Sequence, residues 1–191
     1  MSGPNGLRRR DLAMDPARSE ALLESGFCGR LATVGADGAP YCTTMLFVRM
    51  DDAIYMHGTR AVGHLRSNIE HEPRVCFLVD EPGEVFDYGR FECDSTVSYS
   101  SVMAFGRVRL VEEAATRQRF FEALMAKYRR DGAPRPRNFF PRIDQIVLYA
   151  LSIEQLTGKE IVLPEVAGRW PALDRSKSPN ARPPERDSAR S

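Results

Sequence analysis

A succession of short strand-like segments, joined mostly by hairpin turns, restricts the fold of this 191-residue chain more than any other feature. The expected strands cover residues 27–34, 41–49, 53–57, 74–80, 95–111 and 145–153. Between the first two, Asp37-Gly38 is a strong signal for a tight antiparallel turn. Few helices interrupt the series, so the pattern favours a mainly β fold: a barrel of six or more largely antiparallel strands with flanking helices.

Three helices are expected among these strands, at residues 15–26, 59–73 and 112–130. Asp15 followed by Pro16 is a good start for the first, with aspartate as N-cap and proline at the first helical position. Thr59 is the expected N-cap of the second. The third carries an apolar stripe at a spacing of four, formed by Phe120, Leu124 and Tyr128. Residues 81–94 are expected to form a loop.

The segment 54–73 combines a short strand, a glycine-punctuated turn and a basic helix. A helix N-terminus presents unpaired N–H groups and a partial positive charge, so it attracts anions. His64 and Arg66 are expected in the first turns of this helix, and His57 lies just before the turn. The combination predicts a site for a phosphate-bearing cofactor. From the residues alone, the simpler interpretation of His57 is a hydrogen-bonded structural histidine, and the alternative for Arg66 is a solvated arginine of the helix surface.

Composition narrows the classes of protein to consider. A formal net charge of +1 provides no global field that would attract nucleic acid or an anionic membrane. No run of 18 apolar residues is present, and no apolar segment follows the charged N-terminus, so we expect a cytoplasmic protein with no membrane or nucleic-acid partner. The four cysteines are far apart and are expected to be buried, reduced thiols rather than metal ligands.

Five segments, in consistent order, resemble the pyridoxamine 5′-phosphate oxidase-like flavoproteins, and most closely the branch that contains the nitroimidazole-resistance (Nim) reductases. They are GRLATVGADGAPYCTTM, IYMHGTRAVGHLRSN, PRVCFLVD, YSSVMAFGRVRLVEE and YALSIEQLTGKE. The resemblance covers roughly residues 12–173. It implies an FMN-binding split β-barrel that forms a homodimer, with two equivalent cofactor clefts at the interface.

The resemblance also implies roles for individual residues. His57 matches the histidine that the Nim reductases hold at their active site, and is the candidate catalytic residue. Arg66 and His64 would bind the FMN phosphate. The complete set of candidate cofactor-binding residues is Thr43, Thr44, Met45, His57, Gly58, Thr59, His64, Arg66 and Ser101; no metal site is expected. The chain departs from the family where many members carry an Arg-Lys pair, because here His64-Leu65 stands in that place.

The expected function is that of an FMN-dependent oxidoreductase. It would take electrons from a nicotinamide or ferredoxin-like donor and reduce a small aromatic or nitro-type acceptor. Three other interpretations stay open: a haem- or F420-binding split barrel, a flavin-binding or sensing module without catalysis, and a dimeric barrel whose cleft is empty. The expected domain organisation is a flexible arm at 1–11, the FMN-binding domain at 12–173 and a disordered tail at 174–191.

Overall fold

The computed structural model describes residues 6–86, 96–129, 140 and 142–162. Two compact units divide the chain: one runs up to residue 80 and resumes at 101–159, and the other contains the described residues 81–86, 96–100 and 160–162. All the candidate site residues lie in the first unit. The expected tail at 174–191, and residues 1–5 of the expected arm, lie outside the described residues.

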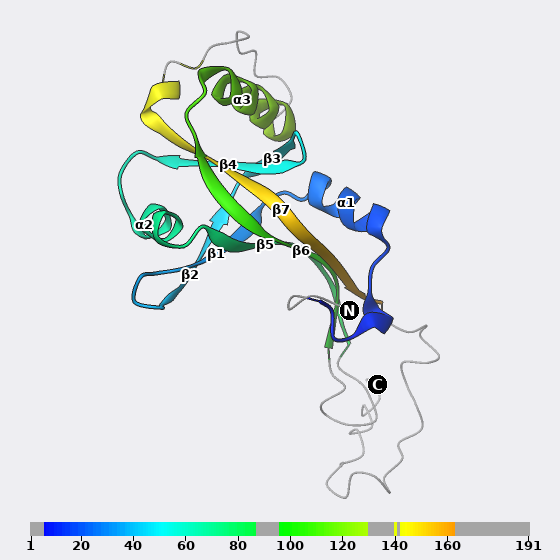
Figure 1. Ribbon diagram of the computed structural model, residues 1–191. Coiled ribbons are helices and arrows are strands. Elements are labelled where there is room, and N and C mark those ends of the chain that lie inside the picture. The colour runs from blue at the N-terminus through cyan, green and yellow to red at the C-terminus, as the bar shows by residue number, and fades with distance from the viewer. Residues whose placement is uncertain (1–5, 87–95, 130–139, 141, 163–191) are drawn as a thin grey trace, which may run out of the picture. The chain divides into compact units, whose positions relative to one another are not determined.

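The elements are η1 (Arg10–Leu12), α1 (Pro16–Ser25), β1 (Gly29–Val34), β2 (Pro40–Met45), β3 (Phe47–Met50), β4 (Ala53–Thr59), α2 (His64–His71), β5 (Arg74–Phe86), β6 (Thr96–Val111), α3 (Ala114–Tyr128), η3 (Ile143–Gln145) and β7 (Ile146–Ile161) (Figure 1). The expected first helix is confirmed, because Asp15 accepts hydrogen bonds from the N–H groups of Ala17 and Arg18. The expected third helix is also confirmed, and its Phe120 and Leu124 are buried.

The strands form one seven-stranded sheet in the order β2-β1-β5-β6-β7-β4-β3. The pairs β1–β2, β1–β5, β3–β4 and β4–β7 are antiparallel. β2 and β3 are the two edges of this sheet, yet only Leu46 separates them in the chain. Because two residue steps reach at most about 7 Å, the sheet must curl so that the end of β2 comes close to the start of β3. The fold is therefore the predicted mainly β barrel with flanking helices.

The prediction of one strand over residues 41–49 is wrong, because the segment is divided at Leu46 into two strands at opposite edges of the sheet. The alternation of exposed and half-buried residues along β2 ends there, and Phe47 and Val48 are both buried. Local alternation cannot reveal a change of partner strand, since both halves have the same extended backbone.

The prediction that Thr59 begins a helix is also wrong. Thr59 is the last residue of β4 and pairs with Ile146 of β7. The helix begins at His64, with Gly63 as N-cap. The expected loop at 81–94 is likewise too long, because β5 continues to Phe86; residues 87–94 lie outside the described chain. In both cases strand pairing extends regular structure beyond the point where the local sequence signals a stop.

Two apolar layers lie on opposite faces of the sheet. The inner layer is the barrel core, which includes Leu31, Phe47, Met56, Phe77 and Tyr149 and receives side chains from α1 and α2. The outer layer lies between the sheet and α3 and consists of Val48, Ala53, Tyr55, Val111, Phe120, Leu124, Leu148 and Ala150. Figure 1 shows α3 alongside β3 and β4, and α2 beside β1 and β2. Successive residues of β4 and β7 therefore point alternately into the barrel and towards α3.

Candidate functional site

The start of α2 has the properties of an anion site. Gly63 supplies no capping side chain, and the first helical hydrogen bond runs from Ser67 N to Gly63 O at 3.0 Å. The N–H groups of His64, Leu65 and Arg66 precede that bond and have no partner within the helix. A side-chain atom added at Gly63 would meet nothing within 4 Å, so the space at this helix end is open. A phosphate group fits these features.

Arg66 points its guanidinium at acceptors from its own chain. Nε donates to Glu70 Oε1 at 2.8 Å and Nη1 donates to the carbonyl oxygen of Arg60 at 3.2 Å. The hydrogen bond to Glu70 raises the pKa of Arg66 above its ordinary value. Arg60 in turn donates through Nη1 to the carbonyl oxygen of Asp144 at 2.9 Å, which ties the β4–α2 turn to η3.

Two contacts fix α2 against the strands beside it. The side-chain Nδ2 of Asn68 donates to Oγ1 of Thr33 on β1 at 3.0 Å, in a buried hydrogen bond. The ring of His64 stacks on Tyr41 of β2, with centroids 5.6 Å apart and an angle of 26° between planes. Tyr41 thus forms a wall beside the helix start.

Tyr149 of β7 approaches the same place from inside the barrel. It is 2% exposed, and a side-chain atom added at Gly58 would lie 3.5 Å from its ring. Burial raises the pKa of Tyr149, while the charge of Arg66 acts in the opposite direction, so the hydroxyl and the guanidinium are electrostatic neighbours. Gly58 and Arg66 therefore both lie near Tyr149, and His64 precedes Arg66 by two residues on α2.

The three candidate residues on β2 divide between its faces. Thr43 lies opposite the buried Leu31, and Met45 packs against the barrel core. Both share the inner face with Tyr41, whereas Thr44 is exposed on the outer face. β2 is an edge strand, so one row of its backbone N–H and C=O groups faces away from the sheet. Those groups suit the polar edge of a flavin ring.

His57 lies on the other face of β4. It pairs with Leu148 of the outer layer, and its ring lies 5.6 Å from Phe120 and 5.5 Å from Phe121 of α3. Its Nδ1 is buried and makes no hydrogen bond to any of the described residues. Burial lowers the pKa of His57 below its ordinary value, so the imidazole is neutral near pH 7. A neutral imidazole has one donor and one acceptor to offer a ligand.

The remaining candidates lie apart from the start of α2. Thr59 is exposed at the end of β4. Ser101 lies on β6, and its hydroxyl donates to the carbonyl oxygen of Lys159 on β7 at 3.4 Å. Within one chain, the structure thus groups Gly58 and Arg66 near Tyr149, whereas His57 faces α3.

Sequence reasoning missed Glu70, Tyr149, Arg60 and Tyr41. Glu70 could have been found, because it follows Arg66 by four residues on a helix, the spacing of a side-chain ion pair. The other three depend on strand register and on a turn conformation that no local pattern indicates.

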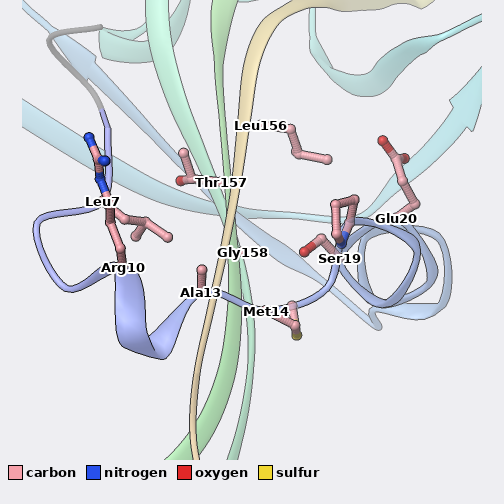
Figure 2. A pocket seen from close by; sticks show the side chains of 10 residues that line it. Leu7, Arg10, Ala13, Met14, Ser19, Glu20, Leu156, Thr157 and Gly158 are labelled. Carbon is pink, nitrogen blue, oxygen red and sulfur yellow. The ribbon is translucent and has the colours of Figure 1, made fainter. Parts of the chain in front are cut away.

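Two hollows lie away from this group. The hollow in Figure 2 has a volume of about 540 Å³ and lies between the N-terminal segment, α1 and β7. Its lining residues include Arg10, Ser19 and Leu156, and none of them is a candidate site residue. A groove of about 730 Å³ lies over the outer face of β1, β2 and β5, where Cys42 and Cys76 flank Ala32. Cys42 is exposed, which corrects the expectation that it is buried. Cys93 lies outside the described residues.

Neither a metal centre nor a membrane span is found in the part of the chain that the structure describes. No three or more His, Cys, Asp or Glu side chains gather there in a way that could hold a metal ion. None of its helices combines the length and the apolar character needed to cross a bilayer.

A family model described as pyridoxamine 5′-phosphate oxidase matches residues 15–160, which include every candidate residue. The chain belongs to this family. Its motifs therefore predicted the family correctly. A search of curated proteins finds no match.

Solved structures share the fold of this member of the pyridoxamine 5′-phosphate oxidase family. The flavocytochrome Anf3 from Azotobacter vinelandii matches with a TM-score of 0.67 and 23% identity, over 83% of this chain and 73% of the other. A protein described as a 5-nitroimidazole antibiotic resistance protein, from Bacteroides thetaiotaomicron, matches with a TM-score of 0.62 and 19% identity, over 76% of this chain and 84% of the other. The FAD and heme binding protein from Mycobacterium smegmatis matches with a TM-score of 0.62 and 19% identity, over 81% of this chain and 76% of the other.

Proposed function

We propose that this protein is an FMN-dependent oxidoreductase that reduces a small aromatic or nitro-type acceptor. The observation that carries the proposal is the open, uncapped start of α2 beside Arg66 and His64, in a chain that belongs to the pyridoxamine 5′-phosphate oxidase family. A flavin phosphate is the anion that this family membership suggests for such a place.

The chain's own groups would hold the cofactor as follows. The N–H groups at the start of α2 and the guanidinium of Arg66 would bind the phosphate, because an arginine can bind phosphate through more than one N–H. The inner face of β2, with Thr43 and Met45, would border the ring system, and the free backbone groups of this edge strand would bond its heteroatoms. When bound, a flavin supplies electron transfer between a nicotinamide or ferredoxin-like donor and the acceptor.

His57 would serve as the proton donor or orienting group. Its neutral imidazole retains an N–H, and Nδ1 is buried beside the rings of Phe120 and Phe121. Since His57 faces α3 on the outer side of the sheet, whereas Arg66 lies on α2, we propose that the active form is a homodimer, in which a second copy completes each site. Size-exclusion chromatography with light scattering tests this: a monomer at micromolar concentration would contradict it.

The deciding experiment is the visible spectrum of the full-length protein, followed by titration with FMN. Flavin absorption near 450 nm, or quenching of added FMN fluorescence at micromolar protein, is expected. Arg66→Ala should weaken FMN binding at least about tenfold, since a charged hydrogen bond to phosphate contributes roughly 1.5–3 kcal/mol. A colourless protein that binds neither FMN nor riboflavin overturns the proposal.

The second candidate function is haem binding, which one observation favours. His57 has an unpartnered Nδ1 in an apolar setting, and two of the structures that share the fold are a flavocytochrome and an FAD and heme binding protein. A Soret band that appears on addition of haemin and disappears in His57→Gln would favour this reading over the first.

A further inference from the structure

The charge of Arg66 is already balanced within the chain. Its Nε bonds the carboxylate of Glu70, one turn further along α2. Its Nη1 bonds the backbone carbonyl of Arg60, a neutral acceptor. Nη2 has no acceptor among the described residues. An anion approaching Nη2 therefore meets a guanidinium whose positive charge is offset by a carboxylate a few ångströms away.

Other nearby groups do little to restore a positive field. Arg60 is turned towards the carbonyl oxygen of Asp144. Leu65 is apolar, and the ring of His64 stacks on Tyr41. Glu70 is thus an anionic side chain in direct contact with the arginine that would bind the phosphate.

We infer that Glu70 sets how strongly this site distinguishes a phosphorylated flavin from uncharged riboflavin, and that it weakens the preference for the phosphate. The inference rests on the proposed function. It assigns to Glu70 a role in cofactor specificity, exerted through Arg66 and through direct repulsion of the phosphate. Glu70 acts on the phosphate and not on the flavin ring system. The affinity for riboflavin, which has the ring system but no phosphate, is therefore the reference for the affinity for FMN.

The size of the effect follows from the exposure of the pair. The side chains of Arg66 and Glu70 are 27% and 46% exposed, so solvent screens their charges considerably. Removal of the Glu70 charge is expected to improve FMN affinity about three- to tenfold, and to leave riboflavin affinity unchanged. Because the effect is electrostatic and partly exposed, it should shrink as salt shortens the screening length from about 10 Å at 0.1 M to about 4 Å at 0.5 M.

Glu70→Gln isolates the charge from the geometry. A glutamine keeps a carbonyl oxygen at the position of Oε1, so it can still accept from Arg66 Nε and hold the guanidinium in place. Glu70→Ala removes both the charge and the acceptor. Glu113→Gln is the matched control, because Arg109 and Glu113 form another exposed i,i+4 pair, with 4.0 Å between Nη1 and Oε2, that has no contact with α2's start.

The experiment measures the dissociation constants of FMN and of riboflavin for the full-length chain by fluorescence quenching, at 50 mM and 500 mM salt. The ratio of the riboflavin constant to the FMN constant should rise three- to tenfold in Glu70→Gln at low salt, rise less at high salt, and stay unchanged in Glu113→Gln.

A ratio that is unchanged or lower in Glu70→Gln, in a chain whose wild type binds FMN, overturns the inference and leaves the proposed function standing. A wild type that binds neither flavin overturns both. Thermal unfolding of each variant identifies any loss of folding, and Glu70→Ala provides a second charge-free variant if Glu70→Gln proves unstable.

Discussion

The hydroxyl of Tyr128 makes two hydrogen bonds to one residue, Phe47: it donates to the carbonyl oxygen at 3.0 Å and accepts from the N–H at 3.2 Å. Phe47 is the first residue of β3, immediately after the chain passes from one edge of the sheet to the other. The ammonium group of Lys127 lies 3.8 Å from the centre of the Phe47 ring. The end of α3 therefore fixes the point at which the barrel closes.

Tyr128→Phe should lower the free energy of unfolding by about 1–2 kcal/mol, because two backbone groups of Phe47 lose their partner. Urea unfolding with an unchanged m-value measures this loss. Tyr41→Phe is the control, since the structure describes no hydrogen bond for the Tyr41 hydroxyl. Equal stability of the two variants would contradict the assigned role of Tyr128.

Asp52→Gly should stabilise the protein by about 0.5–1 kcal/mol. Asp52 has a φ of 62°, a left-handed conformation that glycine adopts without a steric cost. The neighbouring Asp51 keeps its ion pair with Arg119, at 2.9 Å. Asp37→Gly in the hairpin between β1 and β2 should instead lower the stability, because it removes the hydrogen bond that Asp37 Oδ1 accepts from Ala39 N at 3.0 Å. Thermal unfolding midpoints that move in the same direction for both variants would contradict this account.

Gly106→Ala should lower stability by about 3 kcal/mol or more. An added Cβ would lie 1.9 Å from the backbone oxygen of Ser152, and neither strand can move without disturbing the pairing of its neighbours. Gly63→Ala is the control, because nothing lies within 4 Å of the added carbon. Chemical unfolding of the two variants tests this; a Gly106→Ala protein as stable as Gly63→Ala would disprove the close approach of β6 and β7.

His57 should make the protein less stable as the solution becomes acidic. Burial lowers its pKa in the folded state, so below the unfolded pKa of about 6.5 the unfolded chain binds a proton that the folded chain does not. The contribution of His57 is therefore fully present above about pH 7 and is lost as the pH falls towards the folded pKa. Urea unfolding at pH 7.5 and 5.5 should show a smaller loss of stability in His57→Gln than in the wild type. Identical losses would mean that the imidazole is not desolvated.

Local sequence determined those features whose physical cause is local. The Asp15 cap followed by Pro16 fixes the start of α1, because side chain and backbone groups only two or three residues apart bond each other. The Asp37-Gly38 turn fixes the first hairpin, because Gly38 takes a φ of 80° that the turn requires. The spacing of apolar residues in α3 reflects the helix period, and the ordered motifs were sufficient to identify the family.

Tertiary structure decided the division of residues 41–49 at Leu46, because strand partners are chosen by the closure of the whole sheet. It also decided the extension of β4 to Thr59, where pairing with β7 outweighs the local capping signal. The sequence named His57, His64 and Arg66 as one group. The pleat of β4 turned His57 towards α3, since alternate residues of a paired strand face opposite sides of the sheet. On α2, Arg66 acts electrostatically on Tyr149, and His64 stacks on Tyr41.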